Sequence, residues 1–195
     1  MAKLIFRYGA MNCGKTTNLL QVAHNYEEKG LKVIIIKSSI DKKGNDNIVS
    51  RLGVERKVDL LLKPNEVIKN KVKLDGLDCI LVDEAQFLEP KQVKELWMIA
   101  KLKDIPVICY GLRTTFKTEL FNGSKVLMGL SDVMEEMVTI CNCGKKARFN
   151  IRKVNNEYIT DGDDVAIDGF NNVTYEAVCG KCYIEKILQN KDISM

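Results

Sequence analysis

Four residues near the N-terminus have the types and the spacing of a phosphate-binding loop. Gly9, Gly14, Lys15 and Thr16 fit the pattern Gly-x-x-x-x-Gly-Lys-Thr. In such a loop the backbone N–H groups surround nucleotide phosphates, the lysine reaches the β- and γ-phosphates, and the hydroxyl ligates Mg²⁺. An ordinary glycine-rich turn is the alternative interpretation. The pattern predicts ATP and Mg²⁺ as ligands, held by the residues Gly9, Ala10, Met11, Asn12, Cys13, Gly14, Lys15, Thr16 and Thr17.

Two acidic residues follow an apolar run further along the chain. The run 80–82 is entirely aliphatic and leads directly into Asp83 and Glu84. We expect Asp83 to hold Mg²⁺ and Glu84 to act as the general base that accepts a proton from an attacking hydroxyl or water. Gln86 is expected beside the nucleotide, where it either orients a water or holds the edge of a base. The alternative is a strand that simply ends in charged surface residues.

Four of the seven cysteines form two close pairs. One residue separates Cys141 from Cys143, and two residues separate Cys179 from Cys182. Four thiolates in two pairs match a closed tetrahedral Zn²⁺ site, although the first pair is tighter than the usual C-x-x-C. The single histidine, His24, is far away in the sequence, so we expect a structural zinc without a catalytic water. An iron–sulfur cluster, a disulfide pair and unbound thiols are the alternatives.

Short apolar runs alternate with helical patterns in the first two thirds of the chain. Strands are predicted at 3–8, 33–36, 79–82 and 107–110, and helices are predicted at 15–29 and from residue 90 onward. This alternation predicts an α/β fold in three layers, with a central parallel sheet covered on both faces. Ligands bind at the carboxyl ends of parallel strands, and both motifs follow such ends. The remaining cysteines are interpreted as loop or core residues: Cys13, Cys79 and Cys109.

The pattern changes after about Val138, where helical periodicity stops and short polar β-like segments lie between the cysteines. We therefore expect an ATP-binding α/β domain over residues 1–139 and a zinc-binding domain with a C-terminal tail over 140–195. The segment 154–178 is rich in Asn, Asp and Gly, and the metal would hold both of its ends. This favours a lid in which Phe170 and Tyr175 can stack on a flat ligand. A plain zinc-ribbon hairpin is the alternative. The polar segment 40–47 is expected to be a loop.

The composition restricts the classes of protein to consider. The chain has 195 residues, of which 46% are hydrophobic and 29% charged, as in ordinary globular domains. A net charge of +4 fits small anionic ligands and gives little support for a nucleic-acid groove. No membrane span and no signal-peptide pattern is evident, so the expected location is the cytoplasm, without a membrane partner.

The motifs together resemble the type II, cellular thymidine kinases over about residues 3–183. They are "GAMNCGKTT", "VDEAQF", "YGLRTTFKTELFNGS" and the split cysteine pairs, in that order. The resemblance implies a RecA-like P-loop domain with a small zinc-binding domain that carries a lasso loop. It implies ATP and Mg²⁺, phosphorylation of the 5′-hydroxyl of thymidine in nucleoside salvage for DNA synthesis, feedback inhibition by thymidine triphosphate, and usually a homotetramer.

The resemblance also assigns roles to residues. Glu84 corresponds to the general base, and the four paired cysteines correspond to the zinc ligands. Met11 is expected beside the thymine, and Tyr175 is expected to be its aromatic partner, with lasso backbone groups reading the base edge. The nucleoside-binding residues implied in this way are Met11, Phe87, Leu112, Phe116, Phe121, Val173 and Tyr175.

Three positions depart from the family pattern. Thr115 stands where related bacterial sequences have the acid of "YGLRTDF", Lys43 replaces the arginine of a D-x-R motif, and Asp168 replaces a glycine of the lasso. A lysine lacks the planar fork of arginine. The spacer from Gly169 to Tyr175 is also about two residues longer. These changes concern the nucleoside pocket and the lasso rather than the chemistry.

Two other classes of protein share some of these features. A nucleic-acid-stimulated P-loop ATPase with a structural zinc ribbon would have the same phosphate loop, but the chain is short and its charge is weakly positive. A zinc-stabilised nucleotide sensor would bind ATP without turnover. Stimulation of ATP consumption by thymidine, with formation of the monophosphate, distinguishes the kinase from both.

Overall fold

The computed structural model describes residues 1–41, 44, 46–50, 53–163 and 172–188. Its main element is a six-stranded sheet with strand order β5-β2-β6-β7-β1-β8, in which every neighbouring pair is parallel. This confirms the predicted parallel sheet. The strands are β1 (Leu4–Tyr8), β2 (Val33–Ser38), β5 (Leu60–Leu62), β6 (Cys79–Asp83), β7 (Val107–Gly111) and β8 (Val133–Glu136).

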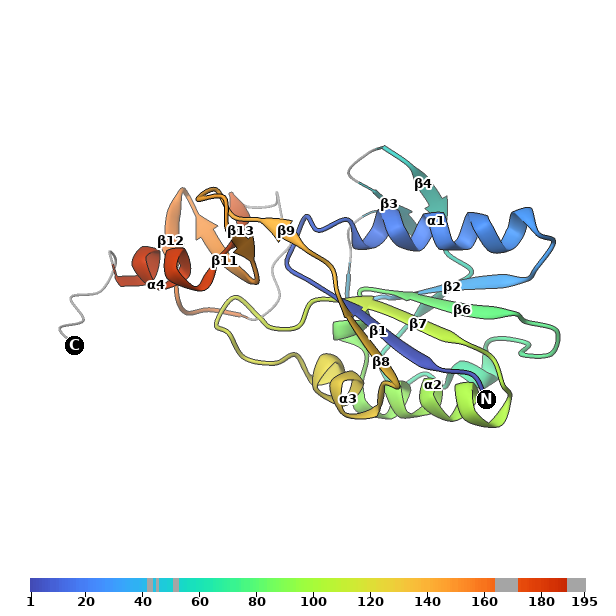
Figure 1. Ribbon diagram of the computed structural model, residues 1–195. Coiled ribbons are helices and arrows are strands. Elements are labelled where there is room, and N and C mark those ends of the chain that lie inside the picture. Colours follow the sequence, from blue (N-terminus) through green and yellow to red (C-terminus); the bar gives the residue numbers. More distant parts are fainter. Residues whose placement is uncertain (42–43, 45, 51–52, 164–171, 189–195) are drawn as a thin grey trace.

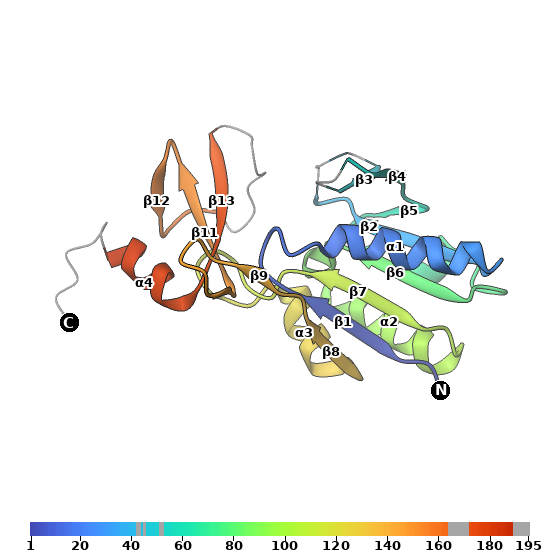
Figure 2. The same cartoon turned by 45° about the horizontal axis from the view of Figure 1, so that its top comes forward.

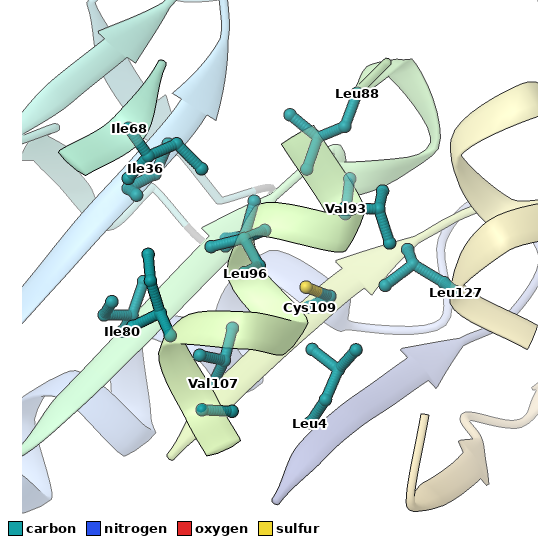
Figure 3. Close-up of a cluster of buried hydrophobic side chains, with 14 of the residues drawn as sticks. Leu4, Ile36, Ile68, Ile80, Leu88, Val93, Leu96, Val107, Cys109 and Leu127 are labelled. Atoms are coloured by element: carbon teal, nitrogen blue, oxygen red, sulfur yellow. The ribbon is translucent and has the colours of Figure 1, made fainter. Parts of the chain in front are cut away.

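Helices cover both faces of this sheet, as Figures 1 and 2 show. Helix α1 (Lys15–Glu28) lies on one face, and α2 (Pro90–Leu102) and α3 (Asn122–Leu130) lie on the other. The alternation of side chains along β6 explains why both faces are apolar. Leu81 packs in the cluster that contains Leu19 of α1, whereas Ile80 packs in the cluster that contains Leu96 of α2 and Leu127 of α3 (Figure 3).

The carboxyl ends of the strands carry the two motifs, as expected for this fold. All five residues of β6 are buried, so the strand delivers Asp83 directly from the core to this edge. A 3-10 turn, η2 (Ala85–Phe87), follows, and α2 then begins at Pro90 with a capping box between Glu89 and Gln92. The turn between Asp83 and α2 is therefore anchored at both ends.

Residues 139–163 and 172–188, which we call the cysteine module, lie beside this edge of the sheet (Figure 2). Strands β9 (Thr139–Ile140) and β10 (Lys146–Ala147) pair with each other. Strands β12 (Glu157–Ile159), β11 (Phe149–Val154) and β13 (Val173–Val178) form an antiparallel sheet in that order. The module has its own small core, which includes Ile151 and Val178.

Two parts of the chain differ from the sequence predictions. The expectation that helical periodicity stops after Val138 is wrong for the last segment, because α4 (Gly180–Leu188) is a helix that packs Tyr183 and Ile187 against the module. These two residues are four apart and share one helix face, but with only nine residues the stripe is short. Asn47, placed in a loop, begins the hairpin of β3 (Asn47–Val49) and β4 (Glu55–Lys57). A 3-10 turn, η1 (Ile68–Asn70), was also not predicted.

Gly123 lets α3 approach the turn that carries the second motif. A Cβ at this position would lie 2.6 Å from Ala85 O and 2.7 Å from Gln86 O, both backbone atoms. We predict that Gly123→Ala lowers the free energy of unfolding by about 1–3 kcal/mol, because the helix must move away from the turn. Chemical denaturation measures this change.

Gly129→Ala is the matched control in the same helix. Gly129 is exposed, and a Cβ there would meet no atom within 4 Å. We expect this substitution to raise the free energy of unfolding by about 0.5–1 kcal/mol, because alanine favours helix. Equal effects of the two substitutions would contradict the close contact at Gly123.

Candidate active site

The phosphate loop connects β1 to α1 and has the backbone geometry of an anion cradle. Gly14 and Asn12 have φ angles of 81° and 66°, so two residues of this tight loop lie in the left-handed region. A Cβ on Gly9 would lie 2.3 Å from Met137 O and 2.6 Å from Cys13 Sγ, so only glycine fits there. The first turn of α1 has no side-chain cap and no acidic residue, which leaves its N–H groups available for phosphate.

Lys15 is held over this loop by the loop's own backbone. Its Nζ donates hydrogen bonds to Ala10 O at 2.8 Å and to Gly9 O at 3.2 Å, and the side chain is buried. Cys13, half-buried, places its sulfur 3.5 Å from the same nitrogen. The ammonium group is thus fixed at the centre of the cradle, where a lysine neutralises phosphate charge.

The acid pair lies at the end of β6. Asp83 is buried, and burial, reinforced by the charge of Glu84, raises the pKa of the Asp83 carboxyl to about 7, while the charge of Lys15 opposes this increase. A buried carboxylate without enough nearby positive charge fits a site for a divalent cation. The carboxylate of Asp83 and the hydroxyl of Thr16 are oxygen groups of the type that Mg²⁺ prefers as ligands.

Glu84 has a backbone conformation that is rare for a residue with a side chain. Its φ of 50° and ψ of 40° lie in the left-handed region, and such strain is concentrated at functional sites. The side chain of Glu84 is held by Gln86. Its Nε2 donates to Glu84 Oε2 at 2.5 Å, and its Oε1 accepts the N–H of Leu112 at 3.0 Å. Gln86, buried, thus connects the Glu84 carboxylate to the end of β7, a contact that sequence reasoning missed.

A cavity of about 540 Å³ opens between these elements, within the usual size range of ligand sites. It is lined by the phosphate loop and α1, by Glu84 and Leu112, and by Val49 of the β3 hairpin. Three lining residues were not predicted: Asn18, Gln21 and Val49. Gln21 could have been found, because it lies one helical turn after Thr17 on the same face of α1. No sequence signal identified Val49.

The residues assigned to the nucleoside fall into three groups. Met11 and Leu112 line the cavity. Phe87 packs against Phe121, with the ring centroids 5.6 Å apart in an edge-to-face arrangement. The last group is Phe116, Val173 and Tyr175. Arg152 lies against the first of these, with its guanidinium carbon 3.9 Å from the centroid of the Phe116 ring.

Arg152 is the residue at the centre of this last group, and sequence reasoning missed it. Its side chain is buried on β11, its guanidinium carbon lies 5.1 Å from the centroid of Tyr175, and its Nε donates to Tyr175 Oη at 2.7 Å. Val173 is half-buried on the same sheet, opposite Val154. In the described part of the chain, Tyr175 therefore faces Arg152 rather than the 540 Å³ cavity.

The four paired cysteines meet at one point of the cysteine module. The Sγ atoms of Cys141, Cys143, Cys179 and Cys182 all lie within 4.8 Å of one another, and those of Cys143 and Cys179 are 3.6 Å apart. Zn–S bonds of about 2.3 Å in a tetrahedron place sulfurs roughly 3.8 Å apart, so the cluster fits zinc. The left-handed φ of Gly144, 81°, closes the turn after the first pair.

Hydrogen bonds within the cluster shift the pKa values of two of these thiols in opposite directions. A hydrogen bond from the backbone N–H of Cys143 lowers the pKa of the Cys141 thiol to about 6. The pKa of Cys182 is raised to about 12, because its S–H is hydrogen-bonded to Cys143. For the two cysteines interpreted as core, burial raises the pKa of Cys79 to about 11 and that of Cys109 further, which keeps both thiols neutral.

The positions that depart from the family pattern are only partly described. Thr115 is buried and closes a turn, with its N–H donating to Glu119 O at 2.8 Å. Asp41, from the D-x-R segment, forms an ion pair of 3.1 Å with the buried Lys37. Lys43 and the lasso residues 167–170, including Asp168 and Phe170, lie outside the described residues.

A glycine-rich phosphate loop between a parallel strand and a helix, with an acid pair at the end of a nearby strand, defines a P-loop nucleotide-binding protein of the α/β class. The family comparison is more specific. The family model described as "Thymidine kinase" matches residues 2–183, and the chain belongs to the thymidine kinase family.

Two relatives illustrate how far this similarity extends. A thymidine kinase from Shewanella oneidensis is 43% identical over 192 residues, which cover 96% of this chain and 99% of the relative. One from Ruegeria pomeroyi is 42% identical over 190 residues, 95% of each chain. Among solved structures, the replication initiator DnaA bound to AMPPCP and single-stranded DNA aligns with a TM-score of 0.45 and 18% identity. That alignment covers 70% of this chain and 40% of the other, and a likeness this weak carries no argument. None of the described helices is long and apolar enough for a membrane span.

Proposed function

We propose that the chain transfers the γ-phosphoryl group of ATP to the 5′-hydroxyl of thymidine, with Glu84 as the general base. The observation that supports this most directly is the single cavity that brings Lys15, Glu84 and Met11 together. A phosphate cradle and a candidate base that face one space can hold donor and acceptor at the same time. Membership of the thymidine kinase family identifies the acceptor class.

The mechanism follows from what each side chain can do. The loop N–H groups and Lys15 hold the phosphates, while Thr16 and Asp83 are the residues that would hold Mg²⁺, which neutralises phosphate charge when bound. Glu84, oriented by Gln86, accepts the proton of the 5′-hydroxyl as its oxygen forms a bond to the γ-phosphorus. The bond between that phosphorus and the bridging oxygen breaks, and ADP leaves.

The thymine ring is proposed to lie against Met11 and Leu112, which line the cavity. The other residues are assigned to the nucleoside by the family resemblance alone, because none of them lines the cavity in the described part of the chain: Phe87, Phe116, Phe121, Val173 and Tyr175. A structural zinc at the four cysteines would keep β11 and β13 in place beside the cavity.

Met11→Gly tests the contact with the base. Removing the side chain removes apolar surface from beneath the ring but leaves the N–H groups of the loop in place. We predict that the thymidine KM rises about tenfold, the effect of losing one to two kilocalories of apolar contact, while the ATP KM changes less. Steady-state kinetics with each substrate varied in turn measures both values. A larger rise in the ATP KM would show that Met11 serves the phosphate cradle instead.

Three further features belong to this proposal and rest on the family resemblance. Thymidine triphosphate is expected to act as a feedback inhibitor, the assembly is expected to be a homotetramer, and the enzyme is expected to work in the cytoplasm in thymidine salvage. Inhibition kinetics and light scattering measure the first two directly.

Release of ADP in the presence of different acceptors tests the proposed function. We expect thymidine to stimulate ADP release strongly, and single-stranded DNA or RNA to leave it at the basal rate. Stimulation by nucleic acid but not by any nucleoside would instead identify a motor ATPase. Tight ATP binding without turnover on any acceptor would identify a sensor.

A further inference from the structure

One side chain of the cysteine module makes a direct hydrogen bond to the phosphate loop. Asn150 lies on β11, and its Oδ1 accepts the backbone N–H of Met11 at 2.8 Å across 139 residues of sequence. Asn150 is 5% exposed and Met11 is half-buried, so this bond is partly shielded from water. Because the Met11 N–H is a donor, the side-chain oxygen of Asn150 must face it, since only this oxygen of the side-chain amide can accept a hydrogen bond.

This bond determines what the Met11 N–H can do. An N–H that points to Asn150 cannot also point to phosphate, so the donors of the cradle are the N–H groups that follow it. The side chain of Met11 lines the cavity. Asn150 therefore acts on the position of a cavity-lining residue without lining the cavity itself.

Two other contacts connect residues 137–139 to the phosphate loop or the strand before it, but neither involves Met11. Met137 N donates to Tyr8 O at 2.7 Å, and Thr139 Oγ1 lies 3.4 Å from Asn12 O. The Met137 contact precedes the cysteine module, and the Thr139 contact comes from β9 at its start. Asn150 alone among these contacts belongs to the antiparallel sheet of the module, where it pairs with Ala177, two residues before the zinc-binding candidate Cys179.

We propose that Asn150 is a positioning residue for the nucleoside site. It fixes the backbone of Met11 from the cysteine module, so that the module holds the floor of the acceptor pocket. The inference rests on the proposed function in so far as Met11 contacts the base. The bond itself and its effect on the loop do not depend on the identity of the substrate.

Two substitutions separate positioning from packing. Asn150→Leu keeps the approximate volume but removes the acceptor, whereas Asn150→Asp keeps the shape and the acceptor. We expect Asn150→Leu to raise the thymidine KM about fivefold to tenfold, the range for one lost hydrogen bond that leaves a partly buried N–H without its partner. Asn150→Asp should keep the thymidine KM within about twofold of wild type, while its negative charge near the phosphates raises the ATP KM in a salt-dependent way.

A second readout does not need turnover. Hydrogen–deuterium exchange of the peptide that contains Met11 should be slow in the wild type and in Asn150→Asp, and faster in Asn150→Leu. Asn142→Ala is the control in the same module, since Asn142 is exposed and bonds to Glu176 rather than to the loop. It should change neither the exchange nor the KM values. Zinc content, measured for every variant, identifies any variant whose module has not folded.

The outcomes are distinct. Equal thymidine KM values and equal exchange in Asn150→Leu and the wild type would overturn the proposal. Equal losses in Asn150→Leu and Asn150→Asp, with zinc retained, would reduce Asn150 to a packing residue and also overturn it. A wild-type protein that does not phosphorylate thymidine would contradict the proposed function, but the exchange measurement would still decide whether Asn150 fixes the loop.

Discussion

Replacing Glu84 by glutamine is expected to lower kcat about 10²- to 10⁴-fold, the usual contribution of a general base. Glutamine has nearly the same shape and can still be held by Gln86, which donates to the Glu84 Oε2 in the wild type. It cannot accept the proton of the 5′-hydroxyl. The affinity for ATP should stay within about twofold, because the phosphate cradle is unchanged. Rapid-quench kinetics of the chemical step and titration with a non-hydrolysable ATP analogue measure the two effects.

Glu28→Gln is the matched control for this substitution. Glu28 is the last residue of α1 and is exposed, so the same loss of charge there should leave kcat unchanged. Near-normal turnover in Glu84→Gln would remove Glu84 from the role of base. An equal loss of ATP affinity would show that the substitution damages the phosphate site instead.

Removing zinc should also abolish activity, but by unfolding the cysteine module. The core of the cysteine module contains five buried residues, and two of these, Cys141 and Cys179, are metal-ligand candidates. Structural zinc sites contribute roughly 10–16 kcal/mol to the folded state, so a core of this size depends on the metal. We predict one zinc per chain by elemental analysis. A strong chelator should abolish thymidine phosphorylation and unfold the module, detected as a loss of β-sheet signal by circular dichroism.

Addition of Zn²⁺ should restore both activity and structure, and addition of excess Mg²⁺ should restore neither, because a thiolate site prefers the softer metal. Cys182→Ser should reproduce the effect of the chelator without any chelator present. A protein that keeps its fold and activity after complete metal removal would contradict the structural role. Iron in place of zinc would correct the identity of the metal.

The central part of the fold could be predicted because its strands are continuous apolar runs. β2, β6 and β7 are covered on both faces, so each contains a continuous apolar run of at least four residues, at 33–36, 79–82 and 107–110. β5 has only three residues and half of the four residues of β8 are glutamates, and both strands lie at edges of the sheet. Edge strands with so few buried residues produce no apolar run of four or more residues in the sequence. α4 was missed for a similar reason, because only one short stripe of it is apolar.

The residues of the candidate site also fall into a predictable and an unpredictable set. Lys15, Asp83 and Glu84 could be found because each belongs to a motif that is local in sequence. Asn150 and Arg152 could not, because their roles depend on partners far away in the sequence. Asn150 reaches Met11 only because β11 packs beside the loop. Arg152 lies against Phe116 only after the cysteine module has folded. Neither residue belongs to a local motif, so the sequence alone marks neither.

The most direct test of the account is the product of a single turnover. The protein is mixed in excess with ATP and thymidine, the reaction is quenched, and the products are identified by mass spectrometry and by ³¹P nuclear magnetic resonance. We predict one ADP for each thymidine 5′-monophosphate, with no inorganic phosphate above background and no ADP when thymidine is omitted. Inorganic phosphate in place of the monophosphate, or ADP formation that does not depend on thymidine, would contradict the proposed transfer.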